Sequence, residues 1–121
     1  MYIACNIAEK FYTAPFLQKN VFYDIIAPPV AYTGQTFWIT IVVIGPTGTT
    51  KTNYAGITSF TSTDNVAQLE GVAMDSYNYQ WLASNFGVKV FVKVTLTALG
   101  LQTIVASDTM DGSITGLTTI M

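Results

Sequence analysis

The side chains of this 121-residue chain that could do chemistry are few. The chain has no His and no Arg, and Cys5 is its single cysteine. Without an imidazole it lacks the usual general base near neutral pH, the usual activator of a nucleophile, and a common ligand of zinc or copper. No spacing supports a Ser or Thr nucleophile activated by a lysine. The composition therefore predicts a protein that is not an enzyme and uses no cofactor.

Aspartates are the candidates for binding a cation. Calcium takes about six to eight oxygen ligands, and two of the aspartates lie three residues apart near a predicted turn. Their spacing matches no dedicated calcium loop, and Asp is common in turns because its carboxylate accepts hydrogen bonds from nearby backbone amides. A role in turns is therefore favoured, with calcium binding as the alternative. The residues concerned are Asp64, Asp75, Asp108 and Asp111.

Aromatic residues form a second candidate site. Tyr77, Tyr79 and Trp81 are spaced two residues apart, so on a strand their rings share one face. Such a row of rings can stack on a sugar or on an apolar partner. Packing in the core is the favoured interpretation, and a stacking face for glycans is the alternative.

The first 19 residues are predicted to form an arm or an extra strand. Their apolar opening alternates, and such a segment can add to the open edge of a neighbouring sheet. Cys5 is expected to behave as a small buried hydrophobe, because no Arg or His is present to lower its pKa. The residues of this possible assembly arm are Tyr2, Ile3, Cys5 and Ile7.

The apolar runs are too short to act as membrane spans. No stretch of about eighteen apolar residues is present, and the first twenty residues lack the basic start and continuous apolar run of a signal peptide. We therefore expect no membrane insertion and no signal peptide in this chain. Two origins remain open: a piece of a longer exported protein with an added Met1, or a product exported or assembled by another route.

Charge is scarce. Charged residues make up 10% of the chain, against about 25% in an average soluble domain. Five scattered lysines without an arginine cannot form the basic patch that nucleic-acid binding needs. The expected partners are therefore other protein domains or copies of the chain itself, with glycans as a further alternative.

The remaining residues predict strands almost throughout. Branched and aromatic residues are abundant, and Gly, Pro, Asn and Asp interrupt them regularly, which is typical of an antiparallel sandwich or barrel. Residues 65–76 are expected to be a crossing loop. The predicted strands cover residues 21–27, 36–44, 57–62, 77–82, 88–96, 100–107 and 113–121.

Two of these strands carry a more detailed prediction. In residues 88–96 the valines alternate with other residues, which places the valines and Leu96 on the buried face and Lys89, Phe91, Lys93 and Thr95 on the solvent face. Residues 36–44 are apolar on both sides at one end, so we expect a central strand whose second face is covered, with Trp38 in the core.

From about residue 28 onward the order of motifs is similar to bacterial immunoglobulin-like surface repeats, which are somewhat like filamin repeats. The motifs are Thr33-Gly34-Gln35-Thr36-Phe37, the turn Gly45-Pro46-Thr47-Gly48, Thr52 to Asp64, Tyr77 to Trp81, Gly87 to Leu96, and Leu99 to Asp108. Residues 65–71 lack the proline common in those repeats, and residues 1–27 have no clear counterpart. The resemblance implies an extracellular, non-enzymatic module that spaces or displays other domains, or packs against copies of itself.

The sequence thus predicts an immunoglobulin-like antiparallel β-sandwich of about seven strands in residues 20–121, preceded by the extension at residues 1–19. The expected function is that of a non-enzymatic structural or adhesive module of an extracellular or surface-exposed protein. One alternative is a self-assembling subunit of a surface filament or particle shell that donates the arm as a strand. A second alternative is a carbohydrate-binding module.

Overall fold

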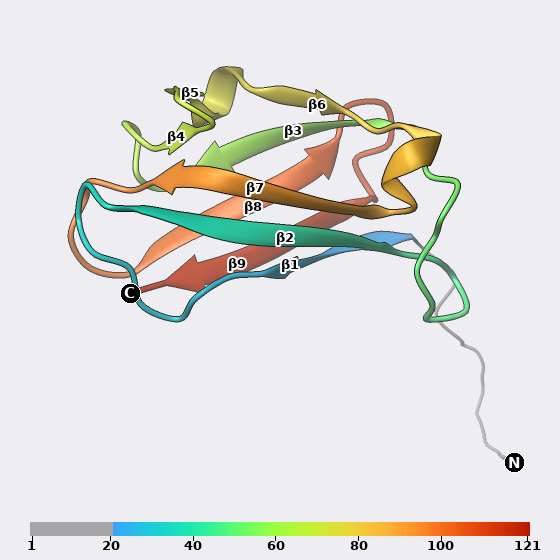
Figure 1. Cartoon of the computed structure of the whole chain (residues 1–121), viewed down its shortest axis with the longest axis horizontal. Coiled ribbons are helices and arrows are strands. Elements are labelled where there is room, and N and C mark those ends of the chain that lie inside the picture. The colour runs from blue at the N-terminus through green and yellow to red at the C-terminus, as the bar shows by residue number, and fades with distance from the viewer. Residues whose placement is uncertain (1–20) are drawn as a thin grey trace, which may run out of the picture.

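Two antiparallel sheets face one another in the computed structural model (Figure 1). The structure describes residues 21–121. The predicted arm, with Tyr2, Ile3, Cys5 and Ile7, lies outside the described residues.

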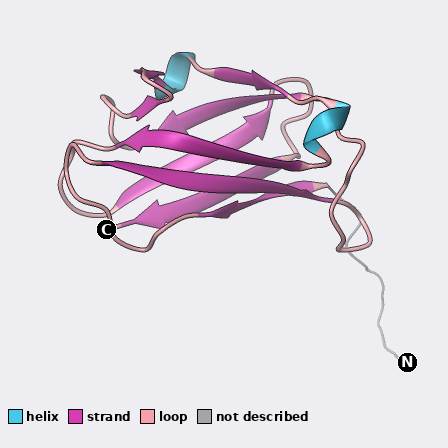
Figure 2. Ribbon diagram, in the orientation of Figure 1, coloured by secondary structure: helices cyan, strands magenta, loops and turns pink. Residues whose placement is uncertain are grey.

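The seven predicted strands are all present. In addition, residues 65–76, predicted as a crossing loop, contain two short strands and a single turn of 3-10 helix at Met74–Ser76. A second such turn covers Ala83–Asn85 (Figure 2). The strands are β1 (Phe22–Ile26), β2 (Thr36–Ile44), β3 (Ile57–Ser62), β4 (Gln68–Leu69), β5 (Val72–Ala73), β6 (Asn78–Gln80), β7 (Val88–Thr95), β8 (Gln102–Asp108) and β9 (Thr115–Ile120).

The strand order confirms the predicted fold class. One sheet has the order β1-β2-β7-β4-β5 and the other β6-β3-β8-β9. If β1, β2, β4 and β7 are strands A, B, D and E, and β3, β8 and β9 are C, F and G, the sheets have the ABED and CFG order of an immunoglobulin constant-type sandwich. Strand β5 extends the first sheet beyond β4, and β6 adds a strand beside β3.

The first and last strands close one side of the sandwich. Strands β1 and β9 run side by side in the same direction (Figure 1). Gly116 lies against the backbone of Tyr23 so closely that a Cβ atom would have no room. Beyond the strands, the Met121 amide donates to the Pro29 carbonyl at 3.0 Å, and the Ala31 amide donates to the Met121 carbonyl at 3.1 Å. Each of these edges is thus covered by the other sheet.

A chain of buried hydrogen bonds crosses the core at one end. The Trp81 indole Nε1 donates to the Thr58 hydroxyl at 2.8 Å, and that hydroxyl donates to the Tyr23 hydroxyl at 2.8 Å. The Tyr23 and Tyr54 hydroxyls are 2.5 Å apart, and Tyr54 donates to the Asp108 carboxylate. Burial raises the pKa of Tyr54, and its bond to Asp108 raises it further. The network links β1 of one sheet to β3 and β8 of the other.

The predicted orientation of β7 is wrong over most of its length. Phe91 is fully buried, whereas Val88, Val90 and Val92 point outward. The ring of Phe91 packs edge-to-face against the rings of Phe60, Tyr77 and Tyr79. Burying this ring removes more apolar surface from water than burying a valine in its place would. A bulge follows, because Ile39 of β2 faces Phe91 while Phe37 faces Val94. The extra residue returns Val94 and Leu96 to the core.

Candidate functional site

The outward surface of the first sheet carries the most prominent candidate site, which we call the outer apolar face. It spans the three adjacent strands β1, β2 and β7. Within the described residues nothing covers it, and the expectation that Trp38 lies in the core is wrong: Trp38 is 62% exposed. The outer apolar face consists of Phe22, Ile26, Trp38, Val88, Val90 and Val92.

Strand register places these side chains together. Phe22 faces Ile44 and Ile26 faces Thr40 across β1 and β2, while Thr40 in turn faces Val90 across β2 and β7. Because side chains alternate along each strand, residues that pair in register point to the same side. The outward positions of the three strands therefore form one continuous surface.

Two charged side chains lie on the same side of the sheet as the outer apolar face. Asp24 points outward from the edge strand β1, between Phe22 and Ile26, and Lys93 is exposed in the bulge of β7. The Glu70 carboxylate accepts hydrogen bonds from the Val92 amide at 2.8 Å and the Lys93 amide at 3.3 Å. These bonds satisfy amides that the bulge removes from the ladder, and so fix Val92 in its outward position.

An open apolar cleft of about 400 Å³ adjoins the face. Trp38 forms part of both the face and the cleft. The lining residues are Ile26, Ala27, Pro28, Phe37 and Trp38. The cleft offers space for an apolar side chain of a partner beside the indole.

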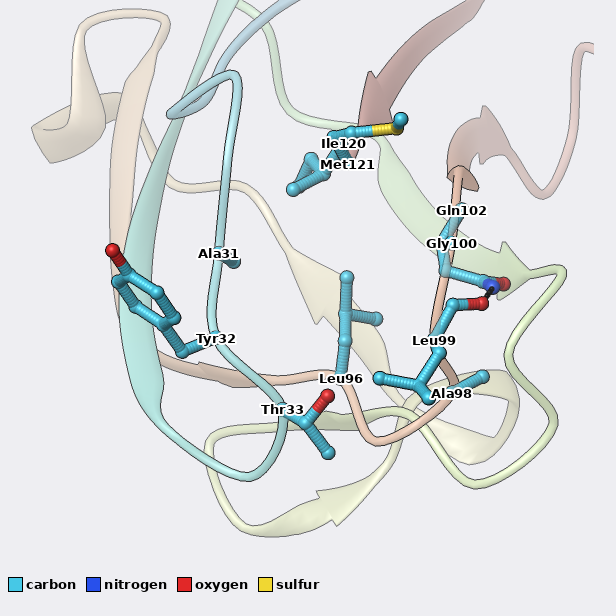
Figure 3. Close-up of a pocket in the computed structure, with 10 residues that line it drawn as sticks. All are labelled: Ala31, Tyr32, Thr33, Leu96, Ala98, Leu99, Gly100, Gln102, Ile120 and Met121. Carbon is cyan, nitrogen blue, oxygen red and sulfur yellow. Dashed lines mark hydrogen bonds between the residues drawn. The ribbon is translucent and has the colours of Figure 1, made fainter.

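A smaller hollow lies at the end of the sandwich where the chain reaches Met121 (Figure 3). Its volume is about 130 Å³, and it lies between the loop at residues 31–33, the loop at residues 96–102 and the end of β9. Leu96 and Ile120 form its buried apolar wall, while Tyr32 and Leu99 are strongly exposed at its rim. This end is therefore apolar as well.

The predicted stacking face is not available as an open platform. Trp81 is 1% exposed and packs edge-to-face against Tyr54 and Tyr79. Tyr77 and Tyr79 are half-buried against the core, and burial raises the pKa of Tyr77, with the charge of Glu70 adding to it. The rings share one face, as the spacing predicted, but that face points into the sandwich. The Lys89 ammonium also lies over the Tyr79 ring, 5.1 Å from its centre.

The candidate calcium ligands meet in pairs at most, and within residues 21–121 no three of them are grouped together. Asp64 is buried and accepts hydrogen bonds from the amides of Val66, Thr97 and Ala98, at 3.1, 2.6 and 3.1 Å. Burial opposes its ionisation, but these amides outweigh that effect and lower the pKa of Asp64. Asp75 lines a cavity of about 70 Å³ together with Asp64.

The other two candidates also serve turns. Asp108 accepts from Tyr54 and from the Met110 and Asp111 amides, and Asp111 accepts from the Ser113 amide and hydroxyl, which lower its pKa. Among residues 21–121, no three His, Cys, Asp or Glu side chains are grouped to hold a metal ion. No helix in that part of the chain is long and apolar enough to cross a membrane.

The sequence matches no protein-family model, and no curated protein is similar to it.

Sequence reasoning did not identify the outer apolar face as a site. Its signal was present in residues 36–44, which are apolar on both sides. This pattern was interpreted as a covered strand, and also as one reason to consider a self-assembling subunit. The part of the face on β7 was missed because the sequence analysis assigned Val88, Val90 and Val92 to the core.

Proposed function

We propose that this chain is a non-enzymatic structural or adhesive immunoglobulin-like module, acting through spacing and protein contact. One observation carries the proposal: the described chain starts β1 at one end of the sandwich and reaches Met121 at the opposite end (Figure 1). A domain held at these two ends separates its neighbours by its full length. An extracellular or surface-exposed location is supported by the resemblance to bacterial surface repeats alone.

Strand arrangement suits this role because tension at the two ends would shear the terminal strands. Strand β1 pairs with β2 over five residue pairs, and β9 pairs with β8 over six. Force along the strands strains all the hydrogen bonds of a ladder together, whereas force across a hairpin end opens them one at a time. The hydrogen bonds of Met121 to Pro29 and Ala31 join the segment after β1 to the end of β9, and tension at the two ends would load them as well.

The end bearing Met121 also suits contact with a following domain. Tyr32, Leu99 and Met121 are all exposed there, around the hollow shown in Figure 3. Exposed apolar residues that gather in one place are typical of a surface that packs against another protein.

Single-molecule pulling tests the proposal. Handles at the two ends of the full chain should give one cooperative rupture with a gain in length on the order of 350 Å for residues 21–121, at about 3.3–3.6 Å per residue. In the matched control the handles are attached at Leu99 and Met121, which lie at the same end of the sandwich. Force between them unzips β8 from β9, one residue pair at a time. Rupture at a clearly higher force with terminal handles is expected. Equal forces in the two geometries would contradict the proposal.

The two alternatives gain less support. A donated strand needs a long open edge, but among the described strands β1 and β9 cover each other, and β4, β5 and β6 have only two, two and three residues. A carbohydrate-binding platform built on Tyr77, Tyr79 and Trp81 would need these rings exposed, and Trp81 is buried.

A further inference from the structure

We infer that the outer apolar face is the interface of a homodimer, in which the same face of a second copy of this chain packs against it. The inference goes beyond the proposed function, because a spacing module held at its ends needs no apolar sheet face. It is carried by different residues, those pointing outward from β1, β2 and β7.

Area is the first argument. From their exposed fractions the six residues present on the order of 500 Å² to solvent, within the about 300–600 Å² that the largest patch on a typical monomer covers. Two such faces packed together would remove about 1,000 Å² from water, the area that a specific interface should clear. The face is thus large enough for a second copy without any further surface.

The distribution of charge is the second argument. The central strip around Thr40 and Val90 has no charged side chain, whereas Lys93 lies in the bulge and Asp24 lies on the edge strand β1, between Phe22 and Ile26. Specific interfaces have this anatomy, with an apolar centre and a polar rim that stays in contact with water. A second copy therefore fits chemically, since its own face brings no charge to the centre and the desolvation cost is small.

Trp38 supplies the anchor. Tryptophan is enriched among the residues that dominate binding energy, and such residues insert into apolar pockets. Here the indole is 62% exposed beside a cleft of about 400 Å³. In a two-fold dimer each copy presents both the ring and the cleft, so each contact is made twice. Because residues 21–121 present one such face, assembly through it closes at the dimer.

Light scattering of the full chain over a concentration series tests the inference. The wild type is expected to shift from the monomer to the dimer mass as concentration rises. Val90→Lys puts a charge in the centre of the face and should raise the dimer dissociation constant at least about 30-fold, as loss of a hot spot does. Trp38→Ala should act in the same direction. Leu117→Lys is the matched control, because Leu117 is 61% exposed on the outward side of β9 in the other sheet, and it should leave the dimer unchanged.

Fluorescence provides a second readout. Trp81 is buried in every state, so a change in quenching by acrylamide on dilution reports Trp38. Quenching should increase as the dimer dissociates. A monomer at all concentrations with a readily quenched Trp38 would overturn the inference. So would a monomer with a shielded Trp38, which would assign the cover to residues 1–20, or a dimer that survives both face variants. None of these results would bear on the pulling experiment.

Discussion

The outward surfaces of the two sheets differ in chemistry, although both are formed by antiparallel β-strands. The first sheet presents the outer apolar face, built from valines and aromatics. The second sheet presents hydroxyl groups, since the outward positions of β3, β8 and β9 are mostly Ser and Thr. The register aligns these positions across the strands: Ser59 with Ser107, Ser107 with Thr115, and Thr103 with Thr119.

Hydroxyl groups of the second surface make hydrogen bonds within the protein. The Thr115 hydroxyl donates to the Ala106 carbonyl at 2.9 Å and lies 3.2 Å from that of Ser107. Valine and threonine suit a strand equally well, so strand formation does not explain why one surface is apolar and the other bears hydroxyl groups. The comparison teaches that the apolar residues of the outer apolar face are not required by the fold, and that a partner is the physical reason to place them there.

The largest expected change in the free energy of unfolding comes from a pair of substitutions that tests which side of β7 faces the core. Phe91→Ala should lower the free energy of unfolding by about 3–5 kcal/mol, because it removes a ring from the packed interior. Val90→Ala, one residue away but outward, should cost less than about 1 kcal/mol in the monomer. Urea unfolding at low protein concentration measures both. The reverse order of effects would mean that the valines face inward and would abolish the distinction between the two surfaces.

A smaller effect concerns the connection between the two sheets. Asp64 follows β3 of the second sheet and holds the amides of Thr97 and Ala98, where the chain leaves β7 of the first. Asp64→Asn should cost about 1.5–3 kcal/mol at pH 7, as expected for hydrogen bonds to a charged group.

This loss should depend on pH with a definite sign. The folded-state pKa of Asp64 is lowered, so its stabilisation is fully present above the unfolded value of about 3.9 and is lost as pH falls through the lower folded value. The difference between wild type and Asp64→Asn, measured by urea unfolding, should therefore shrink below about pH 4. Asp111→Asn is the comparison variant. Its carboxylate bonds only within a local turn, so its loss should be smaller, with the same sign of pH dependence because its pKa is also lowered. A difference that stays constant down to pH 2 would exclude this role of the carboxylate.

The smallest effect is expected on the second outward surface. Thr103 and Thr119 face each other across β8 and β9, and replacing both by Val should change stability by no more than about 0.5 kcal/mol. The same variant should leave the dissociation constant of the dimer unchanged. A large loss of stability would show that the hydroxyls support the fold and would weaken the comparison between the two surfaces.

The sequence by itself determined the class of fold and most strand positions. Turn residues and β-branched runs bound the strands, and β2 and β3 have the predicted limits because both the residues and their flanking turns are unambiguous. The aspartates were also interpreted as turn residues, and the carboxylates of Asp64, Asp108 and Asp111 accept hydrogen bonds from amides of the residues that follow them. These features depend on neighbours along the chain, which a single sequence displays.

Only the tertiary structure decided which side of β7 is buried and therefore where the candidate site lies. The alternation in residues 88–96 is compatible with either orientation, and the choice was made by Phe60, Tyr77 and Tyr79, which meet Phe91 from distant parts of the chain. The bulge that reverses the alternation depends on Glu70, which lies in the turn between β4 and β5 and accepts a hydrogen bond from the Val92 amide. Orientation is a competition between two faces for one core, and its outcome depends on packing partners that are far apart in sequence.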